Sequence, residues 1–138
     1  MPAESTLLYS NAAGQLLADP NRFLRAHWAD APRTLADTQA LFTNIAQALR
    51  TRGWGRVLIN QVGMRPFSAT EQQWVSQQWL PEAVQQHGYR YGAVVVSTDA
   101  YTRLATAYIT TSVGGLPLRY RSSDTEAEAV AWLLQQPA

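Results

Sequence analysis

The sequence predicts an α/β domain with one mixed β-sheet. Short apolar runs rich in β-branched residues, such as 57–59 and 93–96, alternate with segments of helical spacing over most of the chain. The first 28 residues instead show loose alternation interrupted by turn residues. A length of 138 residues suits one domain. We therefore expect residues 1–138 to form a single domain in which an N-terminal β meander precedes βαβα units.

The N-terminal meander is predicted from three short strands. Residues 5–11 and 15–18 flank a turn that ends at Gly14, which is typical of a hairpin. Residues 22–28 alternate well enough for a third strand, in which either Phe23 or Leu24 faces the core, depending on register.

A long helix is expected next, from Asp30-Ala31-Pro32 through Arg52. Proline is tolerated in a first helical turn, where its missing N–H costs least. Gly53 can supply a left-handed cap at the other end. The residues that should face the core recur at helical spacing and are Leu35, Phe42, Ile45 and Leu49.

The central part of the chain combines a buried strand, residues 56–61, with a capped helix. Ser68 and Glu71 form the Ser-x-x-Glu pattern that satisfies free N–H groups at a helix start. This helix should run to His87 and stop at Gly88, with a kink at Pro81.

The last third repeats the alternation. Residues 89–96 predict a strand, typically one covered on both faces and otherwise one with a single open face, and residues 116–121 predict another. Between them Ser97-Thr98-Asp99 starts a helix that ends at Gly114-Gly115. Its expected apolar side consists of Tyr101, Leu104, Ala105, Tyr108 and Ile109. A second capping box, Ser123-x-x-Glu126, should open the closing helix.

Composition excludes several functional classes. All eleven basic residues are Arg, so a Schiff-base lysine and a P-loop lysine are absent, and the lack of Cys removes thiol nucleophiles and cysteine metal sites. The net charge of +1, with Arg spread along the chain, argues against nucleic acid as the partner. No apolar run approaches the roughly 18 residues of a membrane span, and we expect a cytoplasmic protein.

The order of elements, together with several short phrases, resembles the STAS domain fold, in particular its SpoIIAA-like (STAS/CRAL-TRIO-like) bacterial branch. The phrases are Val57-Leu58-Ile59-Asn60, Ser68-x-x-Glu71-x-x-Trp74 with Trp79-Leu80-Pro81, Ala93-Val94-Val95-Val96 followed by Thr98-Asp99-Ala100-Tyr101, and Glu128-Ala129-x-x-Trp132-Leu133. This resemblance covers nearly the whole chain and implies a regulatory module that acts through protein contacts.

The phosphorylation switch of STAS anti-sigma-factor antagonists does not carry over. The acidic residue and the glycine that flank the phosphorylated serine in that family are missing around Ser68, whose expected role is a helix N-cap. Asn60 stands where the SpoIIAA-like branch often has an acidic residue, which weakens a charge-based site there.

Candidate binding residues lie where strands end, because ligands of open α/β sheets gather beyond the carboxyl ends of the strands. The three segments are 60–65, 97–101 and 121–124. Arg65 could hold an anion beside the helix that begins at Ser68, against the plainer interpretation of a solvated side chain. The tentative binding residues are Asn60, Arg65, Ser68, Trp79, Asp99 and Tyr101.

No catalytic or metal-binding pattern stands out. His27 and His87 lack ligand spacing, and there is no Gly-x-Ser-x-Gly elbow. Trp74, Trp79 and Trp132 are either core residues or, with the Gln-rich helix 72–86, part of a dimer or partner interface.

Two functions remain. The first is a non-enzymatic regulatory module that binds a protein partner or a second copy of itself as a homodimer. The alternative is a carrier or sensor of a small apolar or anionic ligand bound at the carboxyl ends of the strands. Neither requires a cofactor or a metal.

Overall fold

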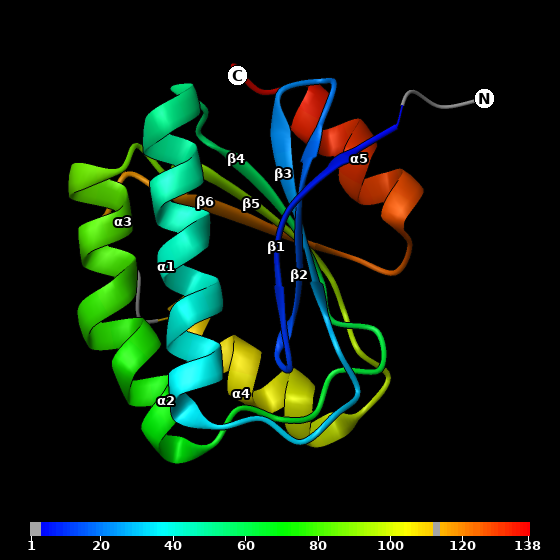
Figure 1. The fold of residues 1–138 in the computed structure, drawn as a ribbon, viewed down its shortest axis with the longest axis vertical. Coiled ribbons are helices and arrows are strands. Elements are labelled where there is room, and N and C mark those ends of the chain that lie inside the picture. Colours follow the sequence, from blue (N-terminus) through cyan, green and yellow to red (C-terminus); the bar gives the residue numbers. More distant parts are fainter. Residues whose placement is uncertain (1–3, 112–113) are drawn as a thin grey trace.

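The computed structural model describes residues 4–111 and 114–138 and contains one mixed six-stranded sheet (Figure 1). The strands lie in sequence order. The first three pair antiparallel, and the third to sixth pair parallel. They are β1 (Thr6–Asn11), β2 (Gly14–Asp19), β3 (Phe23–Trp28), β4 (Arg56–Asn60), β5 (Tyr91–Val95) and β6 (Arg119–Ser123). The predicted fold class, an N-terminal meander followed by alternating strands and helices, is confirmed.

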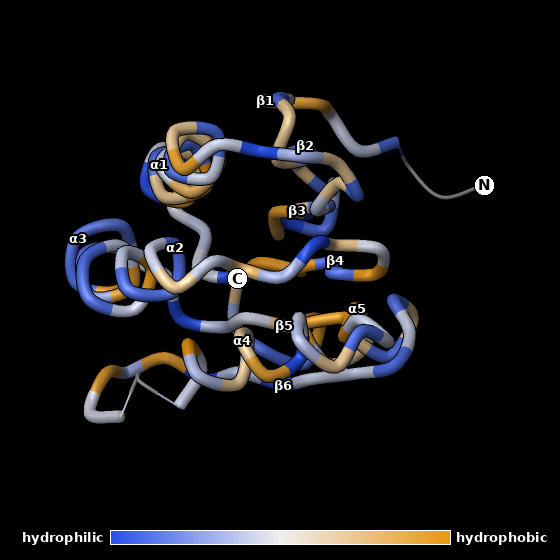
Figure 2. The backbone as a smooth tube through the Cα atoms, turned by 90° about the horizontal axis from the view of Figure 1, so that it is seen from below, coloured by the Kyte–Doolittle hydropathy of each residue, from blue (hydrophilic) through white to orange (hydrophobic). Residues whose placement is uncertain are grey.

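Helices cover both faces of the sheet. Figure 2 shows the strands as one row, with α1 and α3 on one side and α5 on the other. The larger core lies under the first group, and a smaller one lies under α5. The elements on the larger core are α1 (Leu35–Arg52), α2 (Ala69–Trp74), the π-helical turn η1 (Val75–Trp79), α3 (Leu80–Gln86) and α4 (Ala100–Thr111); α5 (Glu126–Leu134) packs alone.

The two-sided cover explains an ambiguity in β3. Phe23 and Leu24 are both fully buried, because Phe23 enters the core under α5 while Leu24 enters the core under α1. Because helices cover both faces of the strand at this point, both residues are buried and neither has to face solvent.

Helix α1 begins later than predicted. Its N-cap is Thr34, which exchanges hydrogen bonds with Asp37 in a capping box, and Pro32 lies before the helix. Leu35, expected in the core, is therefore a first-turn residue and is 37% exposed. The predicted left-handed cap at Gly53 is confirmed, with φ of 68°.

Pro81 lies in an uninterrupted helical segment from α2 to α3, preceded by η1. At Leu80, the N–H donates to the carbonyl of Val75, five residues back. A π-type turn widens the helix locally, which gives room for a ring that would clash with an α-helical carbonyl. The expected disturbance at Pro81 thus takes the form of a π-bulge.

The closing helix starts differently from the prediction. Ser123 belongs to β6, and Thr125 is the N-cap that accepts from the N–H of Glu128. The helix is tied down by Arg56, which is 5% exposed and donates to the carbonyls of Leu133 and Gln136 at 3.0 and 3.1 Å. It also donates to the carbonyls of Asn21 and Arg22. One buried guanidinium therefore joins β4, α5 and the β2–β3 turn.

Within the described part of the chain, no helix combines the length and the apolar character that crossing a membrane requires.

Candidate functional site

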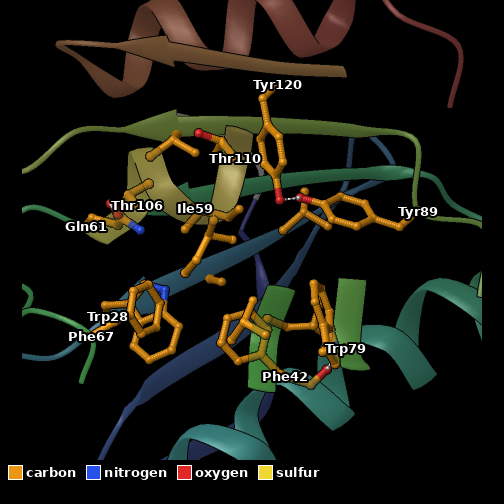
Figure 3. A pocket seen from close by; sticks show the side chains of 16 residues that line it. Trp28, Phe42, Ile59, Gln61, Phe67, Trp79, Tyr89, Thr106, Thr110 and Tyr120 are labelled. Carbon is orange, nitrogen blue, oxygen red and sulfur yellow. Dashed lines mark hydrogen bonds between the residues drawn. The ribbon is translucent and has the colours of Figure 1, made fainter. Parts of the chain in front are cut away.

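A narrow pocket lies between the sheet and the helices of the larger core, with α4 along one side (Figure 3). Its volume is about 30 Å³, which is room for one or two water molecules. The walls are mainly aromatic and aliphatic, and they come from β3, β4, β5, β6, α1, η1, α4 and the loop before α2. Among the described lining residues, none carries a charge.

Four aromatic rings form the wall farthest from α4 in Figure 3. Phe42 is their centre, with ring centroids 4.6 Å from Trp79 and 5.4 Å from Trp28. The ring of Phe67 meets Trp28 edge-on at 5.3 Å. Tilted and edge-to-face pairs at these separations are favourable beyond simple burial. The indole N–H of Trp79 donates to the Phe42 carbonyl at 2.8 Å, which fixes the Trp79 ring beside Phe42.

The opposite end carries two tyrosines, Tyr89 and Tyr120, whose hydroxyls point at each other at 3.4 Å (Figure 3). Tyr89 is fully buried. Burial raises the pKa of Tyr120 to about 12 and raises that of Tyr89 well above its usual value, with the neighbouring tyrosine adding to the latter shift. Both phenols therefore stay protonated at neutral pH and act as neutral hydrogen-bonding groups.

Gly92 makes the space for this pair. A Cβ at that position would lie 2.4 Å from the Tyr120 ring and 2.4 Å from the Tyr89 hydroxyl. Tyr120 pairs with Gly92 across the β5–β6 ladder, so the ring lies directly over the strand backbone. Only a residue without a side chain permits this approach.

Helix α4 presents polar, small side chains to the protein. Thr106 donates to the Oε1 of Gln61 at 2.8 Å, and Thr102 donates to the Met64 carbonyl at 3.1 Å. Gln61 itself is 3% exposed, and no acceptor in the described ranges takes a hydrogen bond from its Nε2. The outer side of the helix carries Tyr101, Leu104 and Tyr108, which are 74, 68 and 54% exposed.

The predicted amphipathicity of α4 is thus wrong at three of five positions. Ala105 and Ile109 are buried as expected, while Tyr101, Leu104 and Tyr108 face outward. The reason lies in the surroundings: the surface under α4 includes the Gln61 amide and the Met64 carbonyl, which need hydrogen-bonding partners.

A buried ion pair supports the aromatic wall from behind. Arg33 contacts Glu71 with two hydrogen bonds of 2.8 and 3.1 Å, and its guanidinium lies 5.3 Å from the Trp28 ring and 5.6 Å from that of Phe67. Glu71 also accepts from the Thr38 hydroxyl and from the Ser68 N–H. Burial raises the pKa of the Glu71 carboxyl, but hydrogen bonds from Arg33, Thr38 and Ser68 outweigh it, so that the pKa is lowered.

Four of the predicted binding residues have local structural roles. Ser68 is the N-cap of α2 and shares a capping box with Glu71, as expected. The Asn60 side chain accepts from the Val62 N–H at 2.9 Å and shapes the loop after β4. Asp99 caps α4 by accepting from the Thr102 N–H at 2.8 Å. Arg65 is exposed and pairs with Asp30 at 3.3 Å, which leaves it no preformed anion site with the α2 N-terminus.

The two aromatic candidates differ in position. Tyr101 lies on the exposed outer side of α4. Trp79 is 7% exposed and lies among core rings, which favours the core alternative over the partner interface. Its ring instead lines the pocket.

The two histidines each lie near one carboxylate. His27 lies 3.6 Å from Glu126, and His87 lies 3.8 Å from Glu82, both as single contacts. Over residues 4–111 and 114–138, no group of three or more His, Cys, Asp and Glu side chains could hold a metal.

Of the residues that give the pocket its polar ends, Gln61 lies in the predicted segment 60–65 without being singled out, and Tyr89 and Tyr120 lie outside all three predicted segments. Gln61 and Tyr89 stand at the margins of predicted strands, where their pattern indicates strand pairing alone. The available signal was Gly92, since a glycine inside a strand often marks the close approach of another group.

No family model matches this chain, and neither curated proteins nor solved structures provided a match. The resemblance to STAS proteins stays a prediction.

Proposed function

We propose that this protein binds a small, largely apolar molecule in the pocket beneath α4, as a carrier or a sensor. The observation that carries the proposal is the lining: a fixed wall of four aromatic rings faces a small number of uncharged polar groups. Pockets for small molecules typically combine an apolar body with a few convergent polar groups.

Ligand entry requires α4 to move away from the sheet, because about 30 Å³ is far below the roughly 300 Å³ of small ligand sites. The contacts of α4 suit such a movement. Its buried side chains are Thr102, Ala105 and Ile109, of which only Ile109 is large and apolar. Separating this helix therefore takes one large apolar side chain of its own, Ile109, out of the core and breaks two threonine hydrogen bonds.

An apolar ligand is favoured over an anionic one. The nearest cation on the aromatic side, Arg33, lies behind Trp28 and Phe67 and is already paired with Glu71. An anion in the pocket would lose its hydration without gaining a charged partner.

Naphthalene is a suitable first probe, because it is neutral and its binding can be followed through the fluorescence of Trp28 and Trp79. We expect saturable binding. Thr110→Phe should weaken it at least tenfold by filling the pocket, since Thr110 lines the pocket, whereas Thr111→Phe, one position along on the exposed side, should leave it unchanged. Native mass spectrometry of protein purified from cells should also show an added mass. Absence of saturable naphthalene binding would contradict the proposal.

A second candidate function is self-association through the outer side of α4. Tyr101, Leu104 and Tyr108 together expose on the order of 400 Å². A stable interface needs about 800 Å² from each partner, so this stripe supplies half of one. For that reason the homodimer ranks second. Light scattering after size exclusion tests it: a monomer at the highest soluble concentration, identical for the native chain and for Leu104→Glu, would contradict it.

A further inference from the structure

The polar groups of the pocket carry more hydrogen-bond donors than the described residues supply acceptors for. Tyr89 and Tyr120 carry two hydroxyl protons, but the bond between them uses one. No other described residue accepts from either hydroxyl, so one proton is left without a protein acceptor. At the Gln61 end, the amide oxygen is occupied by Thr106 while the NH₂ group has no described acceptor.

We propose that the ligand is a neutral molecule with an acceptor oxygen, a carbonyl, ether or hydroxyl, which receives the spare hydroxyl proton of the Tyr89–Tyr120 pair. This inference rests on the proposed function and narrows it to a chemical class. A pocket built to donate a hydrogen bond discriminates against an analogue without the acceptor, because the buried donor is then left unpaired.

Three observations support this assignment, the first two of them for a neutral ligand. First, the lining residues described for the pocket are all uncharged. Second, burial raises the pKa of both tyrosines, so they remain donors rather than phenolates at neutral pH. Third, Gly92 leaves the space that brings the two hydroxyls together, at the cost of a side chain in a central strand.

The geometry also orients the ligand. Figure 3 shows the tyrosine hydroxyls on one side of the pocket, Gln61 on another, and the four aromatic rings across from both. A flat ring would lie against Phe42 and Trp79, with its oxygen turned toward the tyrosines. The Gln61 amide would serve a second oxygen at the other end of a longer ligand.

The test compares naphthalene with 1-acetylnaphthalene, which adds one carbonyl to the same ring system. For each protein we compare the Kd of naphthalene with the Kd of the ketone. We expect this ratio to be about five- to tenfold larger in the native chain than in the double variant Tyr89→Phe/Tyr120→Phe, because the variant lacks one net hydrogen bond to the ketone. Each single Phe variant frees the remaining hydroxyl proton and should keep the preference for the ketone.

The outcomes separate this inference from the proposed function. If naphthalene binds and the double variant keeps the native preference for the ketone, the assignment of the tyrosines is wrong while the apolar pocket stands. If naphthalene does not bind the native chain saturably, the proposed function itself fails. Replacing both hydroxyls leaves no unpaired partner, so the double variant should fold, which far-UV circular dichroism and thermal unfolding check.

Discussion

The strongest test of how the pocket wall is held is Glu71→Gln. The Glu71 carboxylate accepts from Arg33, Thr38 and Ser68, and Arg33 has a side chain only 5% exposed. Glutamine has the same shape but no charge, so the substitution leaves the Arg33 guanidinium buried without its counter-ion. The Phe67 and Trp28 rings rest against that guanidinium, which also donates to the Arg65 and Pro66 carbonyls in the loop before α2.

Removing one partner of a buried ion pair costs about 3 to 5 kcal/mol. We expect the lower end, about 3 kcal/mol, because the amide oxygen of the substituted side chain can still accept from the Ser68 N–H. For a domain of this size, 1 kcal/mol lowers Tm by roughly 3 to 4 °C, so the variant should melt about 10 °C below the native chain. The matched control is Glu82→Gln, an exposed carboxylate in α3, with an expected change within about 0.5 kcal/mol.

The same carboxylate predicts a pH dependence. In the folded chain its pKa lies below the ordinary value of 4.5, so near that pH the unfolded chain binds more protons. The contribution of Glu71 is therefore complete above about pH 4.5 and is lost as the pH falls through the lowered pKa. Differential scanning fluorimetry should show a constant Tm gap between the native chain and Glu71→Gln from about pH 7 to 5, narrowing below about pH 4.5. A gap under about 3 °C, or one independent of pH, would refute the reasoning.

Three further substitutions test the fold around the pocket. Gly92→Ala should cost about 1 to 3 kcal/mol in urea unfolding and reduce naphthalene binding, since its Cβ would lie 2.4 Å from a tyrosine ring; unchanged binding would count against the packing described. Arg56→Gln should lower the free energy of unfolding by about 3 kcal/mol, because buried carbonyls lose their hydrogen-bond donor. Arg50 is exposed, so Arg50→Gln should unfold at the native urea midpoint. Trp79→Ala should cost about 3 to 5 kcal/mol and the half-buried Trp132→Ala less; equal stabilities would place Trp79 outside the core.

The order of helices and strands could be predicted from the sequence because each element contains its own local pattern of apolar, capping or turn residues. The apolar run at Val57–Leu58–Ile59 and the Ser68–Glu71 capping box need no distant partner to be recognised, and both are present as predicted. Gly53 likewise ends α1 in the left-handed conformation that a glycine at that position indicates.

The errors occur where two local signals compete. Pro32 and Thr34 are both good helix starts, and Thr34 prevails because Asp37 completes a reciprocal capping box. Ser123 and Thr125 compete in the same way before α5; pairing with Val95 keeps Ser123 in β6, so the cap moves to Thr125. A single sequence shows both signals and does not show which partner is near.

The pocket could not be predicted from local patterns for a different reason. Its polar end joins Tyr89, before β5, to Tyr120 on β6, two residues whose meeting depends on the strand register and on a missing side chain at Gly92. Its other side is α4, where helical spacing predicts that Tyr101, Leu104 and Tyr108 are buried, yet the threonines face inward. A helix that turns its large apolar groups outward gives up burial energy. Such a departure from pattern is expected at a working site. Here it leaves a helix with one large buried apolar side chain over uncharged donors, which fits the movement of α4 that the proposed ligand would need.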